Sequence, residues 1–138
     1  MSYATVLDAI HEHLAEVPGV NLLIIGEPRT LQTTPAIYSM LRSFTRTSQG
    51  TTVRIVYRTR HRLCVPWVHP EQAEEEIIGF TNAIPAALCA LPDRGALPSG
   101  DMEITLGEAG FVTIGGTEYR SLDFYSEAVE IARLGGNI

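Results

Sequence analysis

Residues 37–63 form two runs in which apolar and polar side chains alternate, joined by Ser48-Gln49-Gly50. Alternation with period two is typical of β-strands, and a glycine at the end of a short connection supplies the positive φ that a hairpin turn requires. We therefore predict a long β-hairpin with a three-residue loop flanked by Thr47 and Thr51. The segment contains no acidic residue and six of the ten arginines: Arg42, Arg46, Arg54, Arg58, Arg60 and Arg62.

Pairing the two runs outward from this loop sets Thr45 opposite Val53. Because strand side chains alternate between faces, one face of the hairpin is then apolar, and the other mixes arginines with large apolar groups. We expect the apolar face to pack in the core and the mixed face to contact a partner. The predicted core face carries Leu41, Val53, Ile55 and Tyr57, and the mixed face carries Met40, Arg42, Phe44, Arg46, Arg54, Val56 and Arg58.

Length and charge restrict the class of protein. A chain of 138 residues suits a single domain over residues 1–138. No apolar run approaches the ~18 residues of a membrane span, and the N-terminus lacks the basic-then-apolar pattern of an export signal, so we expect a soluble protein of intracellular origin. The formal net charge is −6, lysine is absent, and the acids gather at the two ends and in residues 71–76. This polarity indicates self-association between copies at least as much as nucleic-acid binding, which usually goes with a basic domain.

Two amphipathic helices are predicted. Apolar residues recur at helical spacing within residues 2–17, which Pro18-Gly19 terminates, and again after Pro70. The glutamates of residues 71–76 lie in the first turns of the second helix, where the helix dipole favours anions. Pro85 should kink or divide that helix. Its predicted buried stripe is Ala73, Ile77, Phe80, Ile84 and Leu88.

The C-terminal third is predicted to be a β-meander after a Pro- and Gly-rich loop at residues 91–100. Residues 102–106 alternate as a strand, Gly107 to Gly110 turn, residues 111–114 return, and Gly115-Gly116 is a hairpin signal before further strand pattern to residue 131. Residues 135–138 are expected to be a frayed tail. The predicted fold is α+β, with a mostly antiparallel sheet, a long β-hairpin, two main helices on one face and a C-terminal β-meander.

The chain contains no Walker loop, nucleophile elbow or dinucleotide-binding fingerprint. Cys64 and Cys89 lack CxxC spacing and are interpreted as two buried free thiols, with one disulfide as the alternative. The histidines do not form a ligand set either. We therefore expect no enzymatic activity, no cofactor and no metal. The histidines are His11 and His13, on different sides of the first helix, and the isolated His61 and His69.

The order of elements is helix, strand, arginine-bearing hairpin, amphipathic helix and meander, with a loop between Gly26 and Pro35. With the helix ending in Val17-Pro18-Gly19-Val20 and the Pro70-Glu71 helix after the hairpin, this layout resembles the tail terminator (tail completion) proteins of long-tailed bacteriophages and related phage-like particles, over residues 6–131. The resemblance implies an α+β structural protein whose subunits form a homo-oligomeric ring, usually a hexamer. Such a ring caps the tail tube protein and joins it to the head-tail connector protein.

The resemblance also implies a location and a relation to DNA. The protein would be part of the virion tail or of a phage-like particle, assembled in the host cytoplasm. DNA would pass through the ring without being bound specifically, and no membrane would be involved.

Ring neighbours meet through two different patches that must be complementary. The arginine-bearing face of the hairpin and the acidic start of the second helix are such a pair, with aromatic residues as apolar anchors. Alternatively, the arginine stems merely cover an exposed sheet face. The predicted interface residues are Tyr38, Arg42, Phe44, Arg46, Arg54, Arg58, Glu71, Glu74 and Glu75.

Two other functions remain open from the sequence. A head-completion or connector protein of the same particle would share the ring but occupy another position. A nucleic-acid-binding module would use the hairpin as a β-ribbon, with Tyr38, Phe44 and Tyr57 stacking on bases. The overall acidity and the absence of lysine argue against the nucleic-acid-binding module.

Overall fold

The computed structural model describes residues 3–89 and 101–133. The loop predicted at residues 91–100 and the tail predicted at residues 135–138 lie outside the described residues. The elements, in chain order, are α1 (Tyr3–Leu14), β1 (Leu22–Ile25), β2 (Ala36–Gln49), β3 (Thr52–Pro66), α2 (Pro70–Cys89), β4 (Asp101–Ile114) and β5 (Thr117–Arg133).

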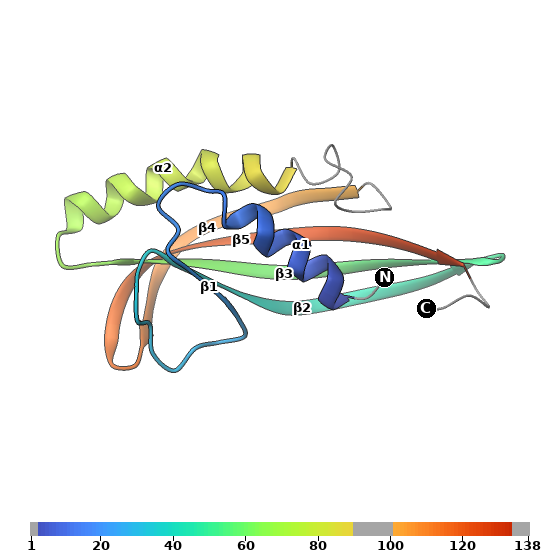
Figure 1. Cartoon of the computed structure of the whole chain (residues 1–138), viewed down its shortest axis with the longest axis horizontal. Coiled ribbons are helices and arrows are strands. Elements are labelled where there is room, and N and C mark those ends of the chain that lie inside the picture. Colours follow the sequence, from blue (N-terminus) through green and yellow to red (C-terminus); the bar gives the residue numbers. More distant parts are fainter. Residues whose placement is uncertain (1–2, 90–100, 134–138) are drawn as a thin grey trace.

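The strands form one five-stranded sheet in the order β1-β2-β3-β5-β4. β1 pairs with β2 in parallel, and all other neighbours are antiparallel. The prediction of a mixed α and β fold with a mostly antiparallel sheet is therefore confirmed. Both helices lie on the same side of the sheet, and the β2, β3 and β5 strands extend beyond them (Figure 1). No helix in the described part of the chain is long and apolar enough to cross a membrane.

The main core lies between the helices and the sheet. All five residues of the predicted α2 stripe are buried, so this prediction is confirmed. They pack with Ile10 and Leu14 of α1 against Leu63, Leu122 and other apolar residues of the sheet. Of the two predicted effects of Pro85, a kink or a division of the helix, the division is wrong, because α2 is one helix from Pro70 to Cys89. Pro85 lies next to the fully buried Ile84, and the packing of this face holds the helix across the missing N–H.

The β2–β3 turn differs from the predicted loop. Gln49 pairs with Thr52, so the connection is Gly50-Thr51 rather than three residues, and Gly50 supplies the positive φ of 61°. The pairing of Thr45 with Val53 is also wrong, since Val53 pairs with Ser48. Val53 itself is fully buried, as predicted.

A β-bulge in β2 changes which side chains share a face. Leu41 pairs with Thr59 and Ser43 with Arg58, so Arg42 is the extra residue. Between this bulge and the turn, Phe44 lies opposite Tyr57 and Arg46 opposite Ile55, on the face that was predicted to hold only core residues. The placement of Phe44 and Arg46 on the mixed face is therefore wrong. Leu41, predicted as core, is exposed.

The predicted meander is replaced by two long strands. Gly107 to Gly110, predicted as a turn, continue β4 without interruption, and β4 turns into β5 at Gly115-Gly116. A short stretch with two glycines does not end a strand when each residue finds its ladder partner in the neighbour. Gly107 pairs with Phe124 and Gly110 with Ser121.

A smaller apolar cluster occupies the opposite side of the sheet. It consists of Tyr38, Cys64, Ile114 and Tyr119, with Leu31 of the 26–35 loop packed against it. Cys64 is a buried free thiol, as predicted, whereas the free Cys89 is exposed. Figure 1 shows the loop and the β4–β5 turn together on this side of the sheet.

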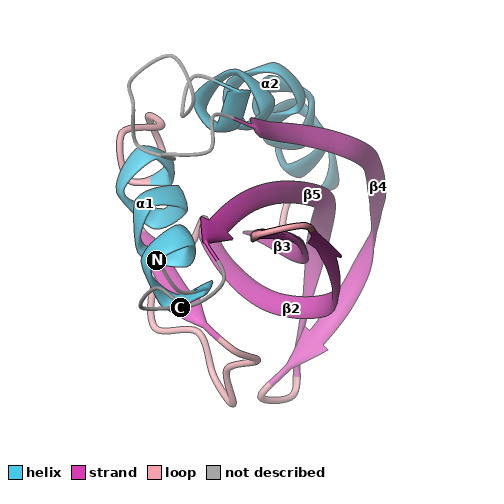
Figure 2. Cartoon of the chain, turned by 90° about the vertical axis from the view of Figure 1, so that its right-hand side faces the viewer, coloured by secondary structure: helices cyan, strands magenta, loops and turns pink. Residues whose placement is uncertain are grey.

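The sheet curls where it leaves the helices. β4 has a second bulge between Ile104 and Leu106, and it lies at nearly the same level of the sheet as the Arg42 bulge, because Leu41 and Ile104 are linked through Thr59 and Ser126. Bulges increase the local twist of a strand. Seen end-on, β2, β3 and β5 wrap around one another (Figure 2). We call residues 41–49 and 52–58 the outer ribbon.

Candidate interaction site

The outer ribbon presents cations and apolar groups together. Arg42, Arg46 and Arg54 are exposed, and the exposed fraction of Phe44 is 59%. The Arg42 guanidinium lies over the ring of Tyr125, 4.4 Å from its centroid. Beyond Ser39, β2 has β3 as its sole strand partner within the described residues, so its other side is a free sheet edge. Such an edge is a ready surface for contact with another chain.

Arg54 lies on the other face of the ribbon, in a shallow depression of about 310 Å³. The side chain makes no ion pair with any residue that the structure describes. Arg58 lines the same depression but donates through Nε to Glu127 Oε1 at 2.8 Å. Of these two predicted interface arginines, Arg54 is thus available to a partner, whereas Arg58 is partly neutralised within its own sheet.

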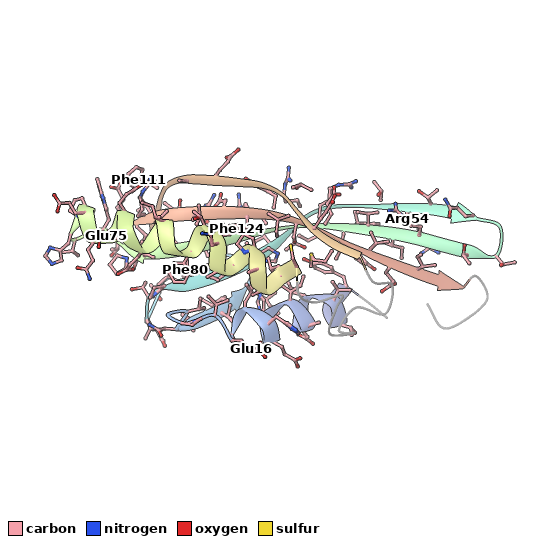
Figure 3. The ribbon with its side chains drawn as sticks, turned by 90° about the horizontal axis from the view of Figure 1, so that it is seen from above. Glu16, Arg54, Glu75, Phe80, Phe111 and Phe124 are labelled. Atoms are coloured by element: carbon pink, nitrogen blue, oxygen red, sulfur yellow. The ribbon has the colours of Figure 1, made fainter. Side chains whose placement is uncertain are left out.

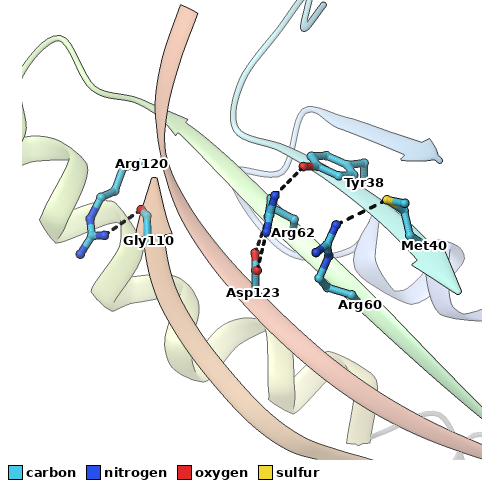
Figure 4. A network of polar contacts seen from close by, with 7 residues as sticks. All are labelled: Tyr38, Met40, Arg60, Arg62, Gly110, Arg120 and Asp123. Carbon is cyan, nitrogen blue, oxygen red and sulfur yellow. Dashed lines mark hydrogen bonds and ion pairs between the residues drawn. The ribbon is translucent and has the colours of Figure 1, made fainter. Parts of the chain in front are cut away.

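A network of polar contacts fixes Arg62 of β3 (Figure 4). Arg62 donates to both carboxylate oxygens of Asp123, at 2.7 and 2.8 Å. The pKa of Arg62 is raised, mainly because of these hydrogen bonds, so the guanidinium stays charged. Bidentate pairs of this kind are strong and geometrically specific. Arg62 therefore serves the fold rather than a partner.

Tyr38 belongs to this network and is fully buried. Its hydroxyl oxygen accepts a hydrogen bond from Arg62 Nη1 at 3.1 Å, and burial raises the pKa of Tyr38. The prediction that Tyr38 is a surface anchor is therefore wrong. Its strand position places it under the 26–35 loop, which the alternation of residues 37–63 did not reveal.

The acidic start of α2 contains three glutamates of the predicted set, of which one forms an ion pair within the subunit. Glu71 and Glu75 are exposed. Glu74 accepts a hydrogen bond from Arg120 Nε at 3.1 Å. Arg120 also lies over the ring of Phe111, 4.8 Å from its centroid. Glu74 is therefore partly neutralised, and Glu71 and Glu75 remain for contact with a partner.

The two charged surfaces lie at different ends of an elongated molecule. Glu75 and Phe111 are at one end, and Arg54 lies toward the other (Figure 3). The sequence predicted both surfaces, but their separation follows from the directions of β3 and α2 in the fold. A molecule with an acidic patch at one end and a basic patch toward the other cannot satisfy both patches within itself.

A buried chain of hydrogen bonds that the sequence did not predict is centred on His61. His61 Nδ1 lies 2.7 Å from Ser39 Oγ, and His61 Nε2 lies 2.8 Å from Ser126 Oγ. His11 Nε2 lies 2.9 Å from the same Ser39 Oγ, which links α1 to the sheet. The pKa of His61 is lowered to about 3, mainly because the ring is completely buried. The charge of His11 lowers this pKa further. Alternation predicts a core position for residue 61. Its serine partners lie on β2 and β5, the two strands that flank β3, and they can be identified only when the register is known.

The described residues contain no group of three or more His, Cys, Asp or Glu side chains placed to hold a metal ion. Compared with known protein families and with curated proteins, the chain matches none. The functional proposal therefore depends on the surfaces described above and on the layout of elements.

Proposed function

We propose that the protein is a structural subunit of a phage or phage-like particle, a tail terminator whose copies form a ring that caps the tail tube and joins it to the head connector. The observation that carries the proposal is the separation of the exposed basic ribbon from the exposed acidic start of α2 (Figure 3). A contact between two different patches on identical subunits is heterologous, and such contacts close into rings when the rotation between neighbours permits it.

The outer ribbon has the composition of an interface element. Arginines and aromatic groups often dominate binding energy, and here Phe44 is exposed beside Arg42 and Arg46. Glu71 and Glu75 of the next copy are the complementary groups. The acidic patch of one subunit then neutralises the basic ribbon of its neighbour.

The nucleic-acid-binding alternative is less well supported. Arg58 and Arg62 are paired with Glu127 and Asp123 of the same sheet, so fewer arginines are free to bind phosphates than the sequence predicts. Tyr38, one of the proposed stacking groups, is buried. The formal net charge of −6 also opposes the approach of a polyanion.

Charge reversal on the ribbon tests the proposal. Arg54→Glu should weaken self-association about tenfold or more, because it sets like charges against Glu71 and Glu75. Arg29→Glu is the matched control, since Arg29 is exposed on the 26–35 loop and the variant has the same net charge. Light scattering over a range of protein concentrations measures both. Equal association of the two variants, or a wild-type protein that stays monomeric at every concentration both free and with tail tubes, would contradict the proposal.

Binding to purified particles separates the terminator from a head-completion protein. We expect the protein to sediment with tail tubes that lack their cap and not with tail-less heads. Sedimentation with heads alone would assign it to the connector.

A further inference from the structure

A groove runs between the end of α1 and the middle of α2. It consists of two hollows of about 360 Å³ and 250 Å³. Both are lined by Pro18 and Ala83, so they adjoin one another. We call them together the α1–α2 groove. Its lining residues are His13, Glu16, Val17, Pro18, Glu76, Gly79, Phe80, Ala83, Ala86 and Ala87.

His13 gives this groove an unpaired acceptor. The exposed fraction of His13 is 9%. Its Nδ1 donates to the carbonyl oxygen of Ala9 at 3.2 Å, and in the tautomer that makes this hydrogen bond Nε2 is an acceptor. Within the described part of the chain, Nε2 is buried without a hydrogen-bond partner. A buried polar atom without a partner is costly, and because His13 is a lining residue of the first hollow, a donor that enters there would satisfy it.

Glu76 gives the second hollow the same property. Its Oε2 is also buried with no hydrogen-bond partner in the described residues. Each hollow is therefore lined by a residue that has a buried polar atom without a partner in the described residues. Glu76 follows Glu75 directly, so the groove continues the acidic start of α2 toward the middle of the helix.

The walls of the groove leave room for a large side chain. Gly79, Ala83 and Ala87 of α2 form one wall, and Val17 and Pro18 form the other. A Cβ built on Gly79 would meet no atom within 4 Å, so the absence of a side chain there keeps the groove open. An apolar group flanked by hydrogen-bond donors would fill this space and satisfy both acceptors.

The outer ribbon carries such a combination. Phe44 is exposed, and Arg46 follows it at the next position on the same face, because strand side chains alternate. A guanidinium has five N–H donors and no acceptor, which matches the acceptors His13 Nε2 and Glu76 Oε2. All basic side chains except histidine are arginines in this chain.

We propose that the α1–α2 groove receives the Phe44 edge of the outer ribbon from a second copy of the chain, with Phe44 between the small side chains and Arg46 donating to His13 Nε2 or Glu76 Oε2. This inference rests on the proposed self-assembly and names the part of the neighbour's acidic surface that the ribbon enters. The contact is heterologous, because the groove and the ribbon are different parts of the subunit.

Filling the groove tests the proposal without weakening the subunit. Gly79→Leu places a side chain in the groove and replaces glycine by a better helix former, so the midpoint of urea unfolding should stay or rise. Self-association should weaken at least tenfold. Asn82→Leu is the matched control, because Asn82 is exposed on the same helix and does not line the groove. Wild-type association of Gly79→Leu overturns the proposal.

A single atom of the groove is tested by His13→Asn. Asparagine keeps a donor for the carbonyl oxygen of Ala9 but lacks an atom at the position of Nε2. We expect a roughly tenfold loss of association under conditions in which the unfolding midpoint shows the variant to be folded. Unchanged association would remove His13 from the contact and overturn its assignment as an acceptor for Arg46.

Mixing two variants tests which surfaces meet. Phe44→Ala has a damaged ribbon and an intact groove. Gly79→Leu has an intact ribbon and a blocked groove. Each alone should be monomeric, and the mixture should form a 1:1 dimer and nothing larger, as measured by native mass. Phe111→Ala, which removes an exposed aromatic group at the other end, is the control for Phe44→Ala.

The outcomes separate this inference from the function on which it rests. If Arg54→Glu weakens association and Gly79→Leu does not, self-assembly stands and the groove is overturned as the receptor. If the mixture forms no dimer, the pairing of ribbon and groove is likewise overturned.

Discussion

At the scale of single residues, the β5 residue opposite each arginine of β3 decides whether that arginine is paired or free. β5 places Glu127 opposite Arg58 and Asp123 opposite Arg62, whereas Arg54 lies opposite Ile131. Both acidic residues are in the sequence, four residues apart like their partners. Their pairing depends on the register of β3 and β5. The sequence does not reveal this register, because a helix and another strand separate the two strands in the chain. The sequence therefore predicts an arginine-rich face but not which arginines are free.

The buried histidine chain makes stability depend on pH. Because the pKa of His61 is lowered to about 3 in the folded state, the unfolded chain takes up a proton below its ordinary value of 6.5 and the folded chain does not. Stability is then complete above pH 6.5 and falls as the pH drops toward 3. The expected slope is roughly 1.4 kcal/mol per pH unit. Urea unfolding at pH 7.5, 5.5 and 4.5 measures it.

A variant isolates the contribution of His61. His61→Gln removes the titrating ring, and although it should be less stable at pH 7.5, its stability should change less between pH 7.5 and 4.5. The comparison is needed because burial lowers the pKa of His11, which acts in the same direction, and raises that of Glu130, which acts in the opposite direction. Parallel pH profiles for the two proteins would show that His61 is not the titrating group.

At the scale of elements, helical periodicity was informative and strand register was not. The buried stripe of α2 follows from spacing alone, because a helix repeats every 3.6 residues whatever it packs against. The faces of β2 depend on the length of the turn at Gly50-Thr51 and on the bulge at Arg42, and each changes the count by one residue. A shift of one residue moves every side chain of a strand to the other face. Phe44 and Arg46 lie between the bulge and the turn, so their faces were wrongly predicted because of the turn alone.

The two hairpin turns should respond differently to the same substitution. Gly50 and Gly115 both have positive φ, of 61° and 58°, so alanine at either position introduces similar backbone strain. A Cβ on Gly50 would meet no atom within 4 Å, whereas one on Gly115 would lie 2.9 Å from the backbone oxygen of Arg29. Gly50→Ala should cost about 1 kcal/mol and Gly115→Ala clearly more.

Thermal unfolding of the two variants measures this difference. The additional loss in Gly115→Ala reports contact between the β4–β5 turn and the 26–35 loop. Equal losses would mean that the loop moves aside at little cost.

At the scale of the whole molecule, the fold class and the two charged surfaces were predictable, whereas the groove was not. Composition and periodicity identify helices, strands and clusters of charge within one part of the chain. The α1–α2 groove brings residues 13–18 together with residues 76–87, and its unpaired acceptors appear only when the packing of two helices is known. Sites of this kind are made by tertiary structure.

Salt should weaken assembly if the ends of neighbouring molecules attract one another. The Debye length falls from about 10 Å at 0.1 M salt to about 3 Å at 1 M, which screens exposed charges. We expect the dissociation constant of the oligomer to rise several-fold when sodium chloride is raised from 0.1 to 0.5 M. Sedimentation equilibrium measures the change. Association that strengthens with salt would indicate a contact governed by apolar surface alone.

The bulge at Arg42 has a consequence for how this surface is inherited. The allocation of Phe44 and Arg46 to one side of the ribbon depends on the number of residues between Phe44 and the turn, not on their chemical kinds. Point substitutions at Arg42 leave that number intact. Deletion of this one codon would also leave it intact, because Leu41 already pairs with Thr59 and Ser43 with the adjacent Arg58, so the bulge would be lost while the two sides of the strand tip are kept.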